Sequence, residues 1–183
     1  SVADMVTHTL DIFCSIISYT SKSSISNRKP ADSFPVDEWQ KVMDVNTRGT
    51  FLCCQAVGRV MIKQRSGKII NISSVRGRYG LPTGQAAYCP SKGAVDALTK
   101  TLACEWARYN VLVNALAPTV VETDFTRDSL ADAKSAEELK ARIPLGRWAM
   151  PGDIVGPILF LASKASNFVT GQIIYVDGGA TTW

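Results

Sequence analysis

The sequence predicts an α/β fold, in which helices cover both faces of a doubly wound parallel sheet. Short apolar segments of strand length alternate with longer segments whose apolar residues recur at helical spacing, and this alternation continues along most of the chain. Strands buried on both faces are expected to be continuously apolar, as these short segments are. A chain of 183 residues can bury one sizeable core, so we expect a single domain over residues 1–183.

The expected strands are residues 68–73, 111–116 and 172–176, and the polar stretch 19–26 is expected to be a loop. In open parallel sheets, ligands bind at the carboxyl ends of the strands. Ser73-Ser74 and Pro118-Thr119 fall at the carboxyl ends of the first two strands. We therefore expect a ligand site at that edge of the sheet.

The expected helices cover residues 35–63, 86–108, 136–141 and 151–162. Asn46 and Thr47 are poor helix formers, and we expect the first helix to bend there. Pro90 is compatible with the second helix because it falls in the first turn, where its missing N–H has no partner to lose.

Composition excludes several classes of protein. The net charge of +4 comes from single Lys and Arg residues scattered among acids, so we expect no nucleic-acid partner. The longest apolar stretches are far shorter than a bilayer requires, and residues 1–19 lack a basic region of the secretory type. Five Cys with a single His and no C-x-x-C pair predict neither a metal site nor a disulfide framework, which indicates a reducing cytoplasm.

Tyr88 and Lys92 are four residues apart at the start of the second expected helix, so both side chains emerge on one face. A tyrosine hydroxyl has a pKa near ~10, and a neighbouring ammonium and the positive end of the helix dipole would both lower it. Tyr88 is therefore a candidate general acid and base. The alternative is a surface helix with an amphipathic Tyr and a solvated Lys.

Two further polar residues extend this candidate site. A Ser74 hydroxyl at the end of a strand could donate a hydrogen bond to an oxyanion beside Tyr88, or it could simply be a turn residue. Asn46 could hold a water against the Lys92 ammonium, or it could satisfy carbonyls that the helix bend sets free.

Six motifs, in order along the chain, carry a resemblance to a known family. They are V-N-T-R-G-T-F at 45–51, G-K-I-I-N-I-S-S at 67–74, Y-C-P-S-K at 88–92, V-N-A-L-A-P at 113–118 with E-T at 122–123, P-L-G-R at 144–147, and T-G-Q at 170–172 leading to D-G-G at 177–179. From about Asn27 to Trp183 the chain resembles the short-chain dehydrogenase/reductase family, which implies a Rossmann-like fold.

The resemblance implies that a hydride moves between NAD or NADP and a small-molecule alcohol or ketone. It implies that Tyr88 exchanges a proton with the substrate oxygen, and that Ser74 holds the substrate carbonyl. Lys92 would bind the nicotinamide ribose and lower the pKa of Tyr88, and Asn46 would complete a proton relay through water.

The segment after the second expected strand would contact the cofactor. The resemblance implies that the backbone at Pro118, Thr119 and Val121 and the hydroxyl of Thr123 lie against the nicotinamide carboxamide. Thr119 stands where the family usually has Gly, so the backbone there differs from the family pattern.

The family's opening strand and its T-G-x-x-x-G-x-G turn are absent from this sequence, together with the residue that selects NAD or NADP. We therefore expect an N-terminally truncated form of the fold, comprising its C-terminal two-thirds. Two interpretations follow. The sequence is a fragment of an active dehydrogenase, or it is a truncated scaffold that does not bind the dinucleotide.

The resemblance is strongest to members that act on sugar acids such as gluconate or deoxygluconate. Arg76, Arg78 or Arg147 could then pair with a substrate carboxylate, unless they are ordinary surface charges. A 3-oxoacyl thioester reductase is the alternative, because its motifs overlap.

The two long helices carry more apolar surface than one sheet face can cover. The apolar positions concerned are Phe51, Leu52, Cys53, Cys54, Val95, Leu98, Leu102 and Trp106. In proteins that resemble this one, these helices meet a symmetry mate and the final strand forms a second contact, so we expect a homotetramer.

Overall fold

The computed structural model describes residues 18–21, 24–82, 84–124, 126 and 131–182. In this part of the chain, four parallel strands form one sheet in the order β1-β2-β3-β4. The strands are β1 (Ser18–Ser21), β2 (Gly67–Ile72), β3 (Val111–Pro118) and β4 (Ile173–Val176). The three strands expected from the sequence are all present.

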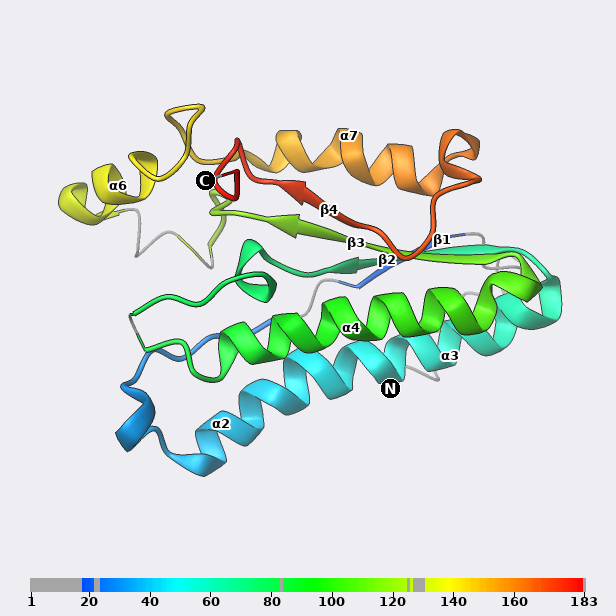
Figure 1. Ribbon diagram of the computed structural model, residues 1–183, viewed down its shortest axis with the longest axis horizontal. Coiled ribbons are helices and arrows are strands. Elements are labelled where there is room, and N and C mark those ends of the chain that lie inside the picture. Colours follow the sequence, from blue (N-terminus) through cyan, green and yellow to red (C-terminus); the bar gives the residue numbers. More distant parts are fainter. Residues whose placement is uncertain (1–17, 22–23, 83, 125, 127–130, 183) are drawn as a thin grey trace.

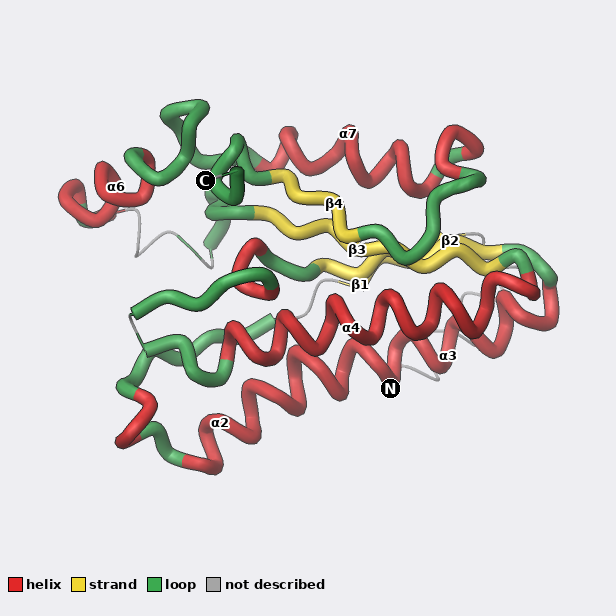
Figure 2. Tube along the Cα trace, in the orientation of Figure 1, coloured by secondary structure: helices red, strands yellow, loops and turns green. Residues whose placement is uncertain are grey.

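Helices cover both faces of the sheet (Figure 1). The helices of the described residues are α2 (Val36–Met43), α3 (Gly49–Gln64), α4 (Tyr88–Trp106), α6 (Ala133–Lys140) and α7 (Pro151–Ala162), of which α3, α4 and α7 lie against the sheet. Figure 2 shows the strands in yellow as a middle layer, with α3 and α4 on one side and α7 on the other. The predicted α/β class with a covered parallel sheet is confirmed.

Each face of the sheet has its own hydrophobic core because successive residues of a strand point to opposite sides. Ile69 packs with Val57 and Met61 of α3 in the core under α3 and α4. The next residue, Ile70, packs with Leu161 of α7 on the other face. Each fully buried side chain of this size contributes about 1.5–3 kcal/mol to folding, so the packing on each face adds to the stability of the fold.

The expectation of a loop over residues 19–26 is wrong at its start, where β1 occupies Ser18–Ser21. This strand pairs with β2 in parallel register, from Ser18 opposite Lys68 to Ser21 opposite Asn71. Pairing of this kind uses backbone groups, which every residue type except Pro can supply. Sequence patterns depend on side-chain polarity. They therefore do not predict a polar strand whose extended conformation is stabilised by pairing with its neighbour.

Where a bend was predicted, near Asn46 and Thr47, a π-helical turn, Asp44–Arg48, joins α2 and α3. In the turn the Asn46 carbonyl accepts a hydrogen bond from Thr50 Oγ1 at 2.7 Å. The Thr47 hydroxyl donates to the Ser91 carbonyl of α4 at 3.2 Å. The turn is thus fastened to the start of the helix that carries Tyr88.

Within the described residues, no helix is long and apolar enough to cross a membrane. Among the same residues, His, Cys, Asp and Glu form no cluster of three or more that could hold a metal ion.

Candidate functional site

The carboxyl ends of β2 and β3 lie at the same edge of the sheet. Ile72 is paired with Leu116, and Ser73 N continues the pairing by donating to Leu116 O at 2.7 Å. Ser74 and Pro118 each lie two residues beyond this pair, so the sequence correctly placed them at one edge.

Ser74 is held at the entrance to a short 3₁₀ turn, Val75–Gly77, in extended backbone conformation. Its Oγ accepts a hydrogen bond from Arg76 N at 3.2 Å, and the side chain is almost fully buried. Because a hydroxyl has one proton to donate as well as lone pairs, this contact leaves the Ser74 proton for another acceptor.

Tyr88 and Lys92 lie together on the first turns of α4. Lys92 Nζ is 5.8 Å from the centroid of the Tyr88 ring, as the four-residue spacing predicted. The same Nζ donates to the carbonyl of Ile72, the last residue of β2, at 2.9 Å. This bond fixes the start of α4 against the strand edge that carries Ser74.

The predicted direction of the Tyr88 pKa is wrong for this chain. Burial raises the pKa of Tyr88 above its usual value of 10, and the nearby hydroxyls of Ser74 and Ser24 and the charge of Arg76 only oppose this effect. The unfavourable free energy of burying a phenolate exceeds the stabilisation that these neighbours provide. Tyr88 is consequently protonated at neutral pH and suited to donating a proton.

Lys92 is only 2% exposed. Burial lowers its pKa from 10.5 to about 8, and the carboxyl of Asp96 opposes the shift. An ammonium has three donors, and among the described residues Lys92 has the single acceptor Ile72 O. Two donors of a buried cation therefore remain for hydroxyl groups of a ligand.

Asn46 is fully buried and makes three hydrogen bonds. Its Oδ1 accepts from Ile25 N at 2.8 Å, and its Nδ2 donates to Ile25 O at 2.9 Å and to Ser91 Oγ at 3.0 Å. The side chain therefore ties the segment before α2 to the helix of Tyr88. Neither interpretation from the sequence anticipated these partners, which are a distant backbone and a side chain of α4.

The segment after β3 is arranged by Thr126. Its hydroxyl donates to Val121 O at 2.6 Å and accepts from Thr123 N at 3.0 Å, and Thr119 N donates to Val176 O at 3.4 Å. The Val121 N–H and the Thr123 hydroxyl have no partner within the described ranges. These two donors, a few residues beyond Pro118, stay available at the same sheet edge.

Arg147 is separate from this site. Its guanidinium makes two bonds to the Asp153 carboxylate, at 2.7 and 3.0 Å, at the start of α7. This pair lowers the pKa of Asp153 to about 2. The suggestion that Arg147 binds a substrate carboxylate is therefore not supported, because a protein carboxylate already fills that position.

Ser24 and Ser91 were not predicted from the sequence to belong to the site. Ser24 Oγ is buried, has no hydrogen bond in the described part of the chain, and acts on the pKa of Tyr88. Ser91 accepts from Asn46 and donates to Tyr88 O at 2.7 Å. Its place three residues after Tyr88 was a usable signal, whereas nothing local connects Ser24 with Tyr88.

The strand edge, the Tyr88–Lys92 pair and the adjacent Ser74 define a class of protein by fold and site, the α/β proteins with polar side chains gathered where the strands of a parallel sheet end. Residues 2–181 match the family model described as enoyl-(acyl carrier protein) reductase. The chain belongs to the short-chain dehydrogenase/reductase family.

Several relatives carry names that point to oxidoreduction. An uncharacterized oxidoreductase of Mycobacterium tuberculosis is 48% identical over 158 residues, covering 83% of this chain and 58% of the relative. Gluconate 5-dehydrogenase of Gluconobacter oxydans is 41% identical over 159 residues, covering 87% and 62%. The chain thus spans about three-fifths of the length of these curated relatives.

A solved structure extends the similarity to three dimensions. Gluconate 5-dehydrogenase of Burkholderia cenocepacia, in complex with NADP and tartrate, is 40% identical with a TM-score of 0.95. The match covers 100% of this chain and 71% of that one.

Proposed function

We propose that this chain carries the reaction centre of an NAD(P)-dependent dehydrogenase or reductase that interconverts an alcohol and a ketone. The observation that carries the proposal is the convergence of Ser74, Tyr88 and Lys92 where β2 ends. A hydroxyl with a proton to donate, a buried phenol and a buried ammonium form a set suited to moving one proton at a substrate oxygen.

In the direction of reduction, Tyr88 donates its proton to the substrate oxygen as the carbonyl becomes an alcohol. Ser74 donates a hydrogen bond to the same oxygen and stabilises the negative charge that develops on it. In the direction of oxidation, the Tyr88 phenolate accepts the alcohol proton. Because burial raises the pKa of Tyr88, its hydroxyl holds at neutral pH the proton that reduction requires.

The residues present fit the nicotinamide half of a dinucleotide. A bound nicotinamide supplies or accepts the hydride, which no protein side chain can do. The two unused donors of Lys92 suit the two hydroxyls of a ribose. The Val121 N–H and the Thr123 hydroxyl, beyond Pro118 and Thr119, suit the carboxamide. The sequence contains no glycine-rich phosphate turn for the adenosine half.

Asn46 has a supporting role in this proposal. Its side chain donates to Ser91, which precedes Lys92 in the chain. A water held between the Asn46 region and Lys92 Nζ would connect Tyr88 to solvent and return its proton.

A sugar acid such as gluconate is the proposed substrate, with a ketone at the oxidised carbon. The similarity to the two gluconate 5-dehydrogenases supports this choice, as does the hydroxy acid tartrate in the Burkholderia complex. A second candidate is the reduction of the ketone of a 3-oxoacyl thioester, which the 41% identity to the 3-oxoacyl-[acyl-carrier-protein] reductase of Synechocystis supports.

Turnover of two substrates separates these candidates. We expect the protein to oxidise NADPH or NADH with 5-ketogluconate faster than with an acetoacetyl thioester. The reverse order would establish the thioester reductase. A folded protein that binds neither nucleotide in calorimetry would identify a scaffold without catalysis.

We also propose a homotetramer, with a smaller contact surface than the sequence suggested. Cys54, Val95 and Leu102 are buried inside this chain, whereas Phe51 and Leu52 of α3 are 40% and 43% exposed. Exposed apolar side chains on one helix are suited to a symmetric contact. Light scattering of the wild type and of Leu52→Lys tests this, and a concentration-independent monomer would contradict it.

The cysteines support a reducing compartment such as the cytoplasm. Cys53, Cys54, Cys89 and Cys104 are free thiols. Persistent free thiols are typical of proteins that glutathione and thioredoxin keep reduced.

A further inference from the structure

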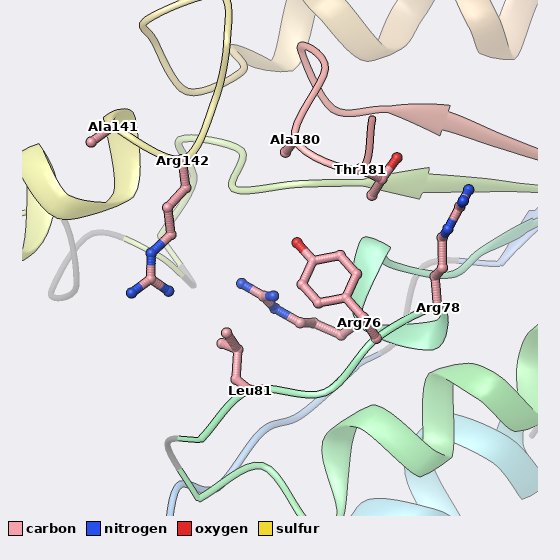
Figure 3. A pocket seen from close by; sticks show the side chains of 8 residues that line it. Arg76, Arg78, Leu81, Ala141, Arg142, Ala180 and Thr181 are labelled. Atoms are coloured by element: carbon pink, nitrogen blue, oxygen red, sulfur yellow. The ribbon is translucent and has the colours of Figure 1, made fainter. Parts of the chain in front are cut away.

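A cavity of about 510 Å³ lies beside the reaction centre, and three arginines line it. We call it the arginine pocket; Arg76, Arg78, Leu81, Arg142 and Thr181 line it (Figure 3). Its volume falls in the range of roughly 300–1,000 Å³ that is typical of small-ligand sites. None of the residues that line it is acidic.

The arginines differ in how they are engaged. Arg78 lies over the Tyr175 ring at 5.4 Å, and Figure 3 shows its side chain pointing away from Arg142. The Arg76 and Arg142 side chains end beside the same open space in that figure. Within the described part of the chain, neither of these two forms a salt bridge.

One donor of the Arg76 guanidinium is left without a hydrogen bond by the protein. Its Nη1 is buried and has no hydrogen-bond partner among the described residues. A buried donor without an acceptor is costly, and more so when the group is charged. Stacking on the Tyr79 ring, 4.9 Å away, orients the guanidinium but supplies no acceptor.

The short turn Val75–Gly77 connects the arginine pocket to the reaction centre, because it contains Arg76 and directly follows Ser74. Ser74 and Arg76 are separated by one residue, and Arg76 N donates to Ser74 Oγ. The charge of Arg76 also acts on the hydroxyl of Tyr88. A group bound on Arg76 is thus close to Ser74 and within the electrostatic reach of Tyr88.

We propose that the arginine pocket is the specificity subsite for an anionic substrate, in which Arg76 and Arg142 bind the carboxylate while the reacting carbon faces Tyr88. This inference rests on the proposed function and names the residues that select an acid. Guanidinium groups match a planar carboxylate through paired hydrogen bonds, which a neutral polyol cannot form.

A small acid fits these observations better than an acidic carrier protein. The cavity has the volume of a small-ligand site and Arg76 is half-buried in its wall, whereas a protein surface docks on exposed side chains. Arg142 is exposed at the rim, so it can close on a small ligand that Arg76 already holds.

Binding measurements test the proposal without requiring turnover. We would titrate D-gluconate and its uncharged counterpart D-glucitol into the wild-type chain, Arg76→Gln, Arg142→Gln and the control Arg147→Gln. We expect gluconate to bind wild type and Arg147→Gln equally, and about tenfold or more weakly in Arg76→Gln. Arg142→Gln should lose less affinity, and glucitol should bind weakly throughout.

Several results would overturn the proposal. Equal gluconate affinity in Arg76→Gln and Arg147→Gln would do so, as would inorganic phosphate binding more tightly than gluconate. Loss of acyl carrier protein binding in Arg142→Gln, with gluconate binding unchanged, would assign the pocket to the carrier. If Arg76→Gln does not fold, Arg76→Lys keeps the charge and should still bind more weakly because it lacks the planar fork.

The same variants keep the two proposals apart. Gluconate binding that depends on Arg76, without oxidoreduction, would uphold the pocket and reject the catalytic function. Turnover of 5-ketogluconate with an unchanged KM in Arg76→Gln would uphold the function and reject the pocket.

Discussion

The reaction centre and the arginine pocket are neighbours, yet the protein satisfies their polar groups to different extents. In the reaction centre the Asn46 side chain is buried with three hydrogen bonds, and Lys92 is anchored on a strand carbonyl with two donors left for a ligand. Arg76 and Arg142 have no ion-pair partner in the described residues, and one nitrogen of Arg76 is buried without an acceptor. Groups that must hold a fixed geometry are satisfied by the protein itself, while groups that await a ligand are left incomplete.

Replacing Tyr88 tests the first half of this comparison and should have the largest effect. Tyr88→Phe removes the hydroxyl and keeps the ring, so we expect turnover to fall by about 10²–10⁴-fold with almost no loss of stability. Steady-state rates and thermal unfolding measure the two quantities. Tyr109→Phe, in the turn after α4, is the matched control and should keep full activity. Retained turnover in Tyr88→Phe would remove Tyr88 from the mechanism.

Asn46→Ala should affect stability more than any change at the arginine pocket. It leaves the N–H and carbonyl of Ile25 without partners, and each such buried group costs about 1–3 kcal/mol. Urea unfolding measures the loss, with the exposed Asn167→Ala as control. An Asn46→Ala variant as stable as the control would show that the region is not held by these bonds.

The Lys92 pKa gives the smallest predicted effect. The folded state holds Lys92 with a pKa of about 8 and the unfolded state with 10.5, so the unfolded state binds more protons between these values. The free energy of unfolding should therefore rise with pH, by about 1 kcal/mol from pH 8 to 9. Above pH 9 the buried Cys54 thiol, with a pKa of about 12, opposes the trend. Urea unfolding of Lys92→Met should lack the rise, and an identical rise in that variant would contradict the assignment.

What could be predicted from the sequence depended on local information. Strands β2 and β3 and helix α7 follow from runs of apolar residues, and the Tyr88–Lys92 pair follows from helical spacing. Strand β1 is polar and is made extended by its neighbour, which no local pattern reveals.

In the candidate site, too, local features could be predicted and features that depend on the whole fold could not. The direction of the Tyr88 pKa was missed because burial depends on the whole fold, not on the neighbour at four residues. Arg142 reaches the arginine pocket from the segment after α6, and its distance along the chain from Arg76 hides the connection.

The π-helical turn determines which face of α3 is directed toward the sheet. A turn of this type contains about one residue more than an α-helical turn, and each residue of a helix corresponds to a rotation of about 100°. Without the extra residue in Asp44–Arg48, the α3 face that bears Val57 and Met61 would turn away from the sheet. Deleting one residue there would restore an ordinary helix locally and misalign sixteen residues beyond it. The π-helical turn therefore adjusts the rotation of the helix about its axis. As a result, one continuous helical segment contributes to the site at one end and to the core at the other.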